Sequence, residues 1–355
     1  MPSYCPCGTR NFSYKQDISV VRTPFHWAVL LIGLLLLLVS PVFLSGVMLN
    51  LLNFIGITVI AVMGLNILTG FCGQISMGQS AFMAVGAYTV AVLGKYYDIS
   101  FLVALPCAGL VTGVVGVFFG LPSLRIKGFY LAMATLAAQF LTPAIISHPL
   151  ESITEGTESL LVAVPSIGGF KFNSPETFFY VVIPITIILV FFAQNLSRTG
   201  IGRAFVAIRD DDLAAEVMGI NIFRYKLTAF FICSVYAGIA GGLWAYWLQS
   251  VNPDHFTLTQ SILFLAMLIA GGMGSVVGAI FGVIFLLGLD HFLVEVSLWI
   301  SMLFPAFSTA TGLQQALSPT AYGLVIVLFL IFEPRGLAYR WDIIKASWRL
   351  RPFAY

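Results

Sequence analysis

Charged side chains are scarce in this chain of 355 residues: Asp, Glu, Lys and Arg make up 9% of it, whereas apolar residues make up 59%. An ordinary soluble domain has about 25% charged and about 45–50% apolar residues. So apolar a chain has too few polar groups to cover its surface in water. The composition therefore excludes an ordinary soluble domain and predicts an all-α integral membrane protein, a polytopic bundle of spanning helices.

The residues that nucleotide binding and catalysis usually require are also missing. No Lys precedes a Ser or Thr, so the chain lacks the G-x-x-x-x-G-K-[ST] loop of P-loop ATPases. None of the scattered His residues has a Cys or carboxylate at triad or metal-ligand spacing. They are His26, His148, His255 and His291. We expect no enzyme, cofactor or metal here, and we expect any ATP hydrolysis to belong to a partner.

The cysteine residues also give little indication of a metal site. Cys5 and Cys7 are close enough in sequence to hold a soft metal, but a structural zinc site needs about four ligands. With no further Cys or His nearby, we interpret the pair as two thiols on a short tail. Cys72, Cys107 and Cys233 lie in apolar segments and are expected to be small core residues.

Acidic residues are nearly absent from the long apolar segments. Asp290 and Glu295 fall near the outer end of one of them. Proton- and sodium-coupled carriers usually hold ionisable groups or unwound helix sites inside the membrane. The scarcity of such groups argues against proton coupling and against a cation channel built on charged rings.

Long apolar runs recur along the whole chain and predict about ten transmembrane helices, each needing about 20 mostly apolar residues. The first run resembles the core of a signal peptide. About 24 residues precede it, which is long for a charged leader, so we favour an uncleaved helix. The motif AGGMGSVVG interrupts the run at 258–296. The expected spans are 25–46, 49–68, 75–93, 101–121, 129–147, 177–196, 227–248, 258–272, 276–296 and 320–332.

Basic residues predict the orientation of these helices, because short cytoplasmic loops are enriched in Lys and Arg. With the N-terminus in the cytoplasm, 15 of the 17 Lys and Arg residues face that side, and Lys95 and Lys171 fall outside. The predicted organisation is a cytoplasmic tail at 1–24, a transmembrane domain at 25–333 and a cytoplasmic tail at 334–355. We therefore expect a multi-pass protein of the cell membrane with both termini in the cytoplasm.

One cytoplasmic loop, residues 197–226, gathers charge and includes the stretch GRAFVAIRDDDLAAEVMGINIFRYK. Asp210 or Asp211 suits a helix N-cap, and Gly219 suits the left-handed residue after a helix end. The pattern predicts a helix of about two turns at 212–218. A helix this short needs support from its surroundings.

Two faces are expected on that helix. Ala214 and Ala215 would form a face without bulk, and a second face would be apolar. The apolar residues are Leu213, Val217 and Ile220. The stretch is either a solvated loop with one helical turn or a docking helix for a cytoplasmic partner.

A second unusual stretch is TGFCGQISMGQSAF, residues 69–82, in which polar side chains and glycines stand at membrane depth or just beneath it. Polar side chains inside a bilayer usually face the bundle interior or a water-filled path. Small residues also serve ordinary helix packing. We favour the path and assign to it Gln74, Ser76, Gln79 and Ser80.

From about residue 51 to 337 the chain resembles the LivM-like permease subunits of branched-chain amino acid ABC importers, in the LivH/LivM family. The resemblance is carried by GLNILTGFCGQISMGQSAFMAVGAY, LPSLRIKGFYLAMATLA, the charged stretch with its flanks, GGMGSVVGAIFGV and FEPRGL. It implies that the charged loop docks on an ATPase as a coupling helix. The residues that match are Arg203, Arg209, Asp210, Asp211, Ala214, Ala215 and Gly219.

The resemblance also implies partners: a second, LivH-like permease, two cytoplasmic ATPase subunits that hydrolyse the ATP, and a soluble solute-binding protein, within membrane lipid and without nucleic acid. The outer loop HPLESITEGTESLLVAVP is a candidate contact for the binding protein, although Glu155 stands where family members often have Gly. The implied solute is a branched-chain or related amino acid. Alternatives are a urea or short-amide ABC permease, an ion-coupled secondary carrier, and a structural or enzyme-anchoring membrane protein.

Overall fold

The computed structural model describes residues 24–123, 130–156, 158–167 and 170–303, and, further on, 320, 322–324, 327–329, 331–333 and 335–350. Helices dominate this part of the chain, as the predicted all-α class requires. Several features expected from the sequence lie wholly or partly outside the described residues. They are the Cys5 and Cys7 pair, Arg125 and Lys127 (two of the basic residues counted on the cytoplasmic side), and part of the expected span at 320–332.

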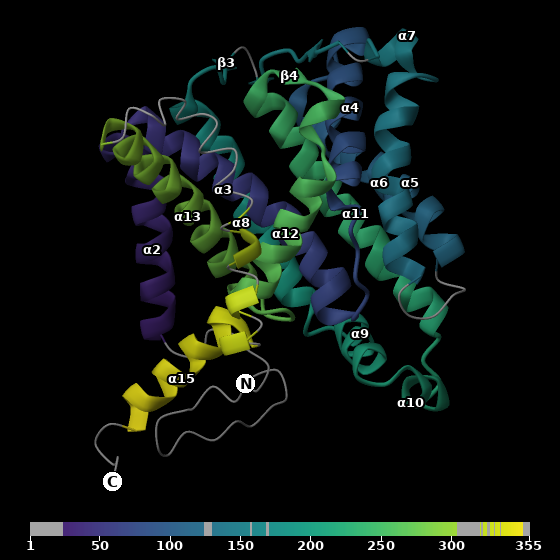
Figure 1. The fold of residues 1–355 in the computed structure, drawn as a ribbon, viewed down its shortest axis with the longest axis vertical. Helices are drawn as coiled ribbons and strands as arrows, with labels where there is room; N and C mark the ends of the chain where they lie inside the picture. Colours follow the sequence, from purple (N-terminus) through teal and green to yellow (C-terminus); the bar gives the residue numbers. More distant parts are fainter. Residues whose placement is uncertain are drawn as a thin grey trace.

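The long helix α11 (Ile222–Leu248) lies at the centre of the bundle (Figure 1). Three helices pack against it: α3 (Gly46–Leu65), α4 (Gln79–Tyr97) and α5 (Phe101–Ser123). The remaining long helices flank this group: α2 (Pro24–Phe43), α6 (Tyr130–Ser147), α8 (Pro175–Leu196), α12 (Leu258–Gly271) and α13 (Val276–Leu303). The core between them holds large aromatic side chains, including Phe82, Phe230 and Tyr236.

Six described helices are long and apolar enough to cross a membrane: Gly46–Phe71, Phe101–Leu121, Pro175–Leu196, Ile222–Leu248, Pro253–Gly271 and Val276–Glu295. Two shorter apolar helices cover Leu31–Phe43 and Leu131–Ser147. These helices overlap the predicted spans, apart from the spans predicted at 75–93 and 320–332, which have no counterpart among them. The described part of the chain therefore confirms a multi-span helical membrane protein, but not the total of about ten helices.

The expected span at 75–93 starts later in the structure. Residues 75–78 are not helical, and α4 begins at Gln79. Gly73 has a φ of 73°, a left-handed conformation that glycine adopts without steric cost, and it breaks the helical path before α4. Other helices enclose most of α4, so small residues such as Gly86 and polar ones such as Gln79 replace the apolar residues that a lipid-facing helix needs.

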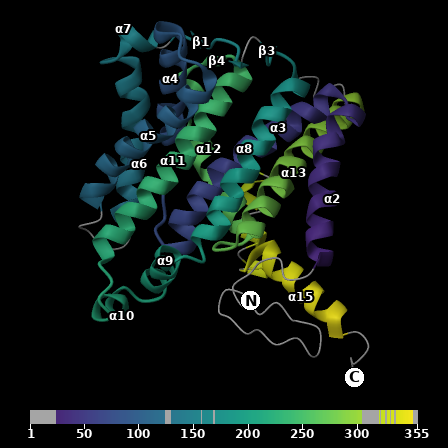
Figure 2. The ribbon, with the colours of Figure 1, turned by 180° about the vertical axis from the view of Figure 1, so that it is seen from behind.

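The two ends of the bundle differ in structure (Figure 2). One end carries α9 (Gly200–Asp210), α10 (Asp212–Val217) and α15 (Gly336–Leu350). The other carries α7 (Glu151–Thr154), η2 (Pro253–His255) and two short antiparallel ribbons. In these ribbons β1 (Leu160–Leu161) pairs with β4 (Ser250–Val251), and β2 (Ser166–Ile167) pairs with β3 (Phe170–Lys171).

The loop after α7 contains a left-handed residue that is not glycine. Glu155 has a φ of 62°, in the region that glycine occupies most easily. Its carboxylate forms an ion pair with Lys95 at the end of α4. The side chain of this left-handed Glu is thus tied to the bundle.

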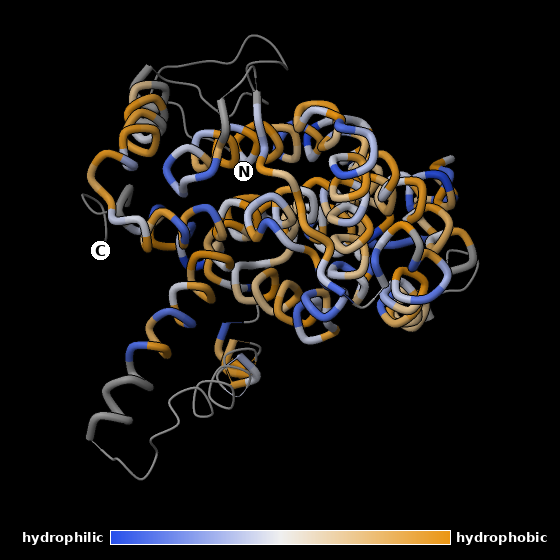
Figure 3. The backbone as a smooth tube through the Cα atoms, turned by 90° about the horizontal axis from the view of Figure 1, so that it is seen from above, coloured by the Kyte–Doolittle hydropathy of each residue, from blue (hydrophilic) through white to orange (hydrophobic). Residues whose placement is uncertain are grey.

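The outward faces of the helices are apolar. Seen from above, hydrophobic residues dominate the helical tubes (Figure 3). Large side chains such as Leu36, Phe43, Val114 and Phe118 are exposed on them. An apolar surface of this extent suits contact with lipid acyl chains rather than water.

Glycines let α11 approach α4 and α5 closely. A methyl group on Gly241 would lie 1.9 Å from the carbonyl oxygen of Met83, and one on Gly86 would lie 2.2 Å from that of Gly238. These contacts are with backbone atoms, which cannot rotate away. The helices at the centre of the bundle therefore depend on the absence of a side chain at these positions.

We predict opposite effects for two Gly→Ala substitutions. Gly241→Ala should destabilise the protein by about 1–3 kcal/mol, because overpacking a close contact has that cost. Gly94→Ala, where nothing lies within 4 Å, should be neutral or stabilising, because Ala favours a helix by up to about 1 kcal/mol. The measurement is the thermal unfolding midpoint in detergent. Equal midpoints for the two variants would contradict the close approach.

Candidate functional site

The helix α9 positions the charged loop against the bundle. Its buried face consists of Gly202, Ala204, Phe205 and Ile208. The ring of Phe205 meets that of Tyr225 on α11 edge to face, with centroids 6.4 Å apart. The hydroxyl of Thr199 caps the start of the helix by accepting a hydrogen bond from the Gly202 amide. This packing holds the otherwise short segment in place.

The expected short helix is present as α10, and its two ends have the predicted chemistry. Asp211 is the N-cap: its Oδ1 accepts hydrogen bonds from the amides of Leu213 at 2.9 Å and Ala214 at 3.1 Å. At the other end Gly219 has a φ of 84°, and the amide of Ile220 donates to the carbonyl oxygen of Ala215 at 3.0 Å. This is the Schellman arrangement that ends helices at glycine.

The faces of α10 differ from the expectation. Ala215 is 3% exposed and packs into the fold, whereas Ala214 is exposed. The two alanines cannot share a face, because neighbouring helical residues point about 100° apart. The outward surface is instead formed by Leu213, Val217 and Met218, which are 63%, 87% and 81% exposed. We call these three the α10 apolar face; Met218 was not expected from the sequence, and Ile220 is only partly exposed.

An ion pair joins α10 to the start of α11. The ammonium of Lys226 lies 2.8 Å from a carboxylate oxygen of Asp212, and both side chains are partly buried. With Ala215 buried beside it, this pair fixes the α10 apolar face in one orientation. The surrounding surface is charged, with Asp210, Asp211 and Glu216 exposed.

Arg209 is exposed, but its guanidinium also reaches the bundle. Its Nη1 donates a hydrogen bond of 3.0 Å to the carbonyl oxygen of Gly70, and its Nε and Nη2 donate to Oδ1 of Asp210. Gly73 lies directly against the arginine stem, since a methyl group there would be 2.8 Å from its Cγ. Arg209 thus links the charged loop to the glycine-rich polar stretch. From the sequence, the two were predicted as separate features. Arg203 lies on the exposed side of α9.

Gly70 belongs to η1 (Asn66–Phe71), a π-helix that continues α3. Inside it, Oδ1 of Asn66 accepts a hydrogen bond from the Gly274 amide at 2.9 Å, and Nδ2 donates to the Ser275 carbonyl oxygen at 3.1 Å. Single-turn π-helices often mark functional sites. We call Asn66, Gly70, Arg209, Gly274 and Ser275 the η1 junction, because they join α9, η1 and the turn between α12 and α13.

The four residues assigned to a path are all buried within this chain. Nε2 of Gln79 donates to the carbonyl oxygen of Ala61 at 2.7 Å, and its Oε1 accepts from the thiol of Cys233. The amide of Ser80 donates to Oγ of Ser261 at 2.9 Å.

These bonds brace α4 against α3, α11 and α12. Oε1 of Gln74 and Oγ of Ser80 have no hydrogen-bond partner in the described structure, and Ser76 bonds weakly to the Gly78 amide. A role for Gln74, Ser76, Gln79 and Ser80 in lining a path stays a prediction. Within the described residues, no three His, Cys, Asp or Glu side chains gather as metal ligands would.

The sequence model of the family described as branched-chain amino acid transport system / permease component matches residues 47–332. The chain belongs to this family. The match contains the η1 junction, both capped helices α9 and α10, and the polar stretch. It also explains the absence of nucleotide-binding and catalytic motifs from the sequence, since the family consists of permease components.

Individual relatives agree with this assignment. The chain is 33% identical to the high-affinity branched-chain amino acid transport system permease protein LivM of Escherichia coli K12, over 72% of this chain and 66% of that protein. It is 35% identical to the Salmonella typhimurium LivM, over 62% of this chain and 57% of that protein. A shorter match, 32% over 31% of this chain and 29% of the relative, is to the xylose transport system permease protein XylH of Escherichia coli K12.

The chain thus covers less than two thirds of the two LivM relatives. No solved structure matches it.

The capping carboxylate of α10 gives a testable expectation. Asp211→Ala should weaken α10 by about 1 kcal/mol, the usual cost of losing an N-cap. That corresponds to about fivefold faster hydrogen exchange at the Leu213 and Ala214 amides. Asp211→Asn should stay close to wild type, because the amide oxygen accepts the same bonds. Equal exchange in both variants would show that Asp211 does not hold the helix.

Proposed function

We propose that this chain is one permease subunit of an ATP-binding cassette importer, forming half of the translocation path for branched-chain or related amino acids. The observation that carries the proposal is the α10 apolar face, a rigidly held apolar surface on a charged loop in a member of this permease family. The names of the LivM relatives support the amino acid as solute.

The α10 apolar face has the properties of a docking site. Leu213 and Val217 are four residues apart and so lie on one side of the helix, with Met218 beside them. Contiguous apolar side chains with a polar rim usually mark a protein contact. Methionine adapts to the shape of a partner pocket. Asp210, Asp211 and Glu216 provide the rim. We infer that this face inserts into a groove on one of two cytoplasmic ATPase subunits.

The η1 junction gives a route by which movement of α10 would reach the bundle. The buried Ala215 and the Asp212–Lys226 pair couple α10 to α11. Arg209, two residues before the N-cap of α10, donates a hydrogen bond to the carbonyl oxygen of Gly70. A rigid shift of the α9–α10 unit must therefore displace η1 or break this bond. We infer that Arg209 is a positioning residue for coupling rather than a contact of the ATPase.

The remaining parts of the proposed importer follow from the ends of the bundle. We infer that the α9–α10 end faces the cytoplasm, because short cytoplasmic loops are enriched in Lys and Arg. On this proposal both termini are cytoplasmic and the chain has about ten spans. A second, LivH-like permease completes the path. The opposite end, with α7 and the β1–β4 ribbon, would receive a soluble solute-binding protein. ATP is bound and hydrolysed by the partner subunits.

The decisive experiment replaces Val217 and Met218 together by Ser and isolates the tagged chain with its natural partner subunits. We expect the copurified ATPase to fall by about 10- to 30-fold, because buried anchor residues contribute about 2 kcal/mol or more to binding. Leu161→Ser, which removes an equally exposed apolar side chain at the opposite end, is the matched control. A large substituent at Ala215 would be unsuitable, because that residue is buried.

Two results would overturn the proposal. Unchanged ATPase recovery with the double variant would show that α10 is a solvated helix. Uptake of leucine into liposomes by the purified single chain, without ATP, would indicate a secondary carrier instead.

Arg209 can be tested separately from docking. We predict that Arg209→Lys retains the ATPases but lowers the amount of solute transported per ATP hydrolysed several-fold, because lysine cannot bond Gly70 and Asp210 with a planar guanidinium fork. Arg224→Lys, an exposed residue of the same loop, should leave that ratio unchanged. The measurement is paired uptake and ATP hydrolysis in proteoliposomes. An unchanged ratio for Arg209→Lys would contradict a coupling role.

A further inference from the structure

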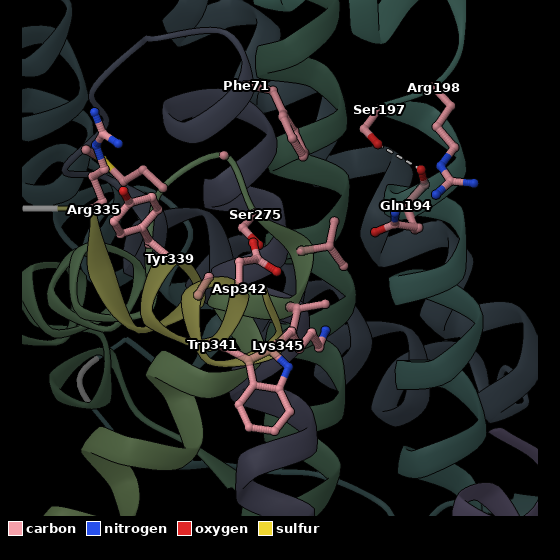
Figure 4. A pocket seen from close by; sticks show the side chains of 16 residues that line it. Phe71, Gln194, Ser197, Arg198, Ser275, Arg335, Tyr339, Trp341, Asp342 and Lys345 are labelled. Atoms are coloured by element: carbon pink, nitrogen blue, oxygen red, sulfur yellow. Dashed lines mark hydrogen bonds between the residues drawn. The ribbon is translucent and has the colours of Figure 1, made fainter. Parts of the chain in front are cut away.

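A cavity of about 550 Å³ opens at the α9–α10 end of the bundle, away from the α10 apolar face. Four segments form its walls: the end of η1 at Phe71, the end of α8 with the residues that follow it, the turn between α12 and α13 with the start of α13, and α15 with the preceding Arg335. Figure 4 shows its lining side chains. The volume suits a small molecule or the head group of a larger one. Neither the α10 apolar face nor the residues assigned to the solute path line this cavity, whereas Gly274 and Ser275 of the η1 junction do.

The cavity has a defined shape, because backbone contacts fix α15 against the turn between α12 and α13. Gly336 has a φ of 72°, and a methyl group on it would lie 2.5 Å from the Cα of Gly272. Gly272 has a φ of 111°, so both residues adopt backbone conformations that favour glycine. Ala338 is buried beside them. The first turn of α15 therefore cannot swing away without breaking this contact.

The cavity is lined by more positive than negative charge. Among the described lining residues, the cations are Arg198, Arg335 and Lys345, and the one carboxylate is Asp342. Figure 4 shows Arg335 and Arg198 on opposite sides, with Asp342 between them. Burial lowers the pKa of the Arg198 guanidinium below its ordinary value, which means that this cation is partly withdrawn from water. Such a lining favours an anion that also carries hydrogen-bond donors for Asp342.

The other lining residues are those of a membrane–water interface. Trp341 and Tyr339 line the cavity together with apolar residues such as Val277. The ammonium of Lys345 lies 5.4 Å from the Trp341 ring centroid, and the guanidinium of Arg335 lies 4.8 Å from that of Tyr339. Trp and Tyr are enriched at the level of lipid head groups. Along α15, exposed Ile343 and Ile344 stand between the basic residues Arg340 and Lys345, and helices that lie in that interface combine apolar and basic residues in this way.

We propose that this cavity binds the head group of an anionic glycerophospholipid from the adjoining leaflet. Arg198, Arg335 and Lys345 donate hydrogen bonds to the phosphate oxygens, and Asp342 accepts one from a head-group hydroxyl. Phosphatidylglycerol has both features. Basic pockets at the cytoplasmic ends of membrane helices bind anionic head groups in this way. The inference depends on the chain spanning a membrane, and it is independent of the transported solute and of the ATPase.

The test uses the purified full chain in detergent and counts bound lipids by native mass spectrometry. Phosphatidylglycerol and phosphatidylcholine with identical chains are added in equal amounts. We expect the wild type to prefer phosphatidylglycerol. The variant Arg335→Gln/Lys345→Gln should lower that preference by about 10- to 30-fold, since each basic residue near an anionic head group contributes about 1 kcal/mol. Both side chains are exposed, so the fold should persist, and the unfolding midpoint checks this.

Arg340→Gln is the matched control. It removes a cation from the same helix, but Arg340 is paired with Glu333 and does not line the cavity, so the preference should remain. An equal loss with Arg340→Gln would reduce the effect to general electrostatic attraction and overturn the proposal. The absence of any preference for phosphatidylglycerol in the wild type would also overturn the proposal.

A second arm distinguishes a lipid from a soluble phosphate compound. Glycerol 1-phosphate is added at the concentration of the lipid. If it displaces phosphatidylglycerol, the cavity recognises a soluble phosphate ester and the lipid proposal is wrong. If the lipid stays bound, its chains contribute as expected. Asp342→Asn should reduce the preference for phosphatidylglycerol over phosphatidic acid, which has no head-group hydroxyl beyond its phosphate, and no change there would remove the role given to Asp342.

Discussion

The hydrogen bond from Arg209 to the carbonyl oxygen of Gly70 connects the charged loop to the spanning helices. A carbonyl at the end of a helix lacks an intrahelical partner, and in an apolar setting it needs one. Here the partner is a guanidinium from a different segment, which also carries positive charge to the negative end of the helix dipole. The loop is therefore held by the same bond that satisfies η1, and neither can rearrange alone. Asn66 extends the arrangement to the α12–α13 turn by bonding two of its backbone groups.

The sequence was sufficient for features that depend on neighbouring residues. The cap at Asp211, the left-handed Gly219 and most of the apolar spans are local in this sense. It was insufficient where distant segments meet: Gly70 and Arg209 are 139 residues apart, and Asn66 and Ser275 are 209 apart. The burial of Ala215 and the exposure of Met218 depend on how α10 packs on α11. In the sequence, only two indirect signals indicate the π-helix: a polar Asn in an apolar run and a glycine-rich turn.

The polar character of α4 has a physical cause that also limits hydropathy as a guide to spans. A helix surrounded by lipid must be apolar on its outer face, but a helix surrounded by protein needs close neighbours and satisfied polar groups. Gly86 allows the backbone of α11 to approach, and Gln79 bonds α3 and α11. A central helix can therefore have weak hydropathy and still lie at the core. The polar stretch that suggests a path is, in its observed contacts, also the means by which the core is held together.

The α9–α10 end of the bundle then presents two surfaces of opposite chemistry. The α10 apolar face has acidic neighbours, whereas the α15 cavity is basic and aromatic. An anionic leaflet attracts basic groups and repels acidic ones within about one Debye length, roughly 8 Å at physiological salt. The same field would thus hold α15 at the membrane and favour an α10 that stands away from it. In Figure 1 the two helices lie on opposite sides of this end, with α15 beneath α2 and α10 beneath α11. A protein partner approaching from the cytoplasm would reach α10 without displacing lipid from α15, so the two surfaces can be occupied at the same time.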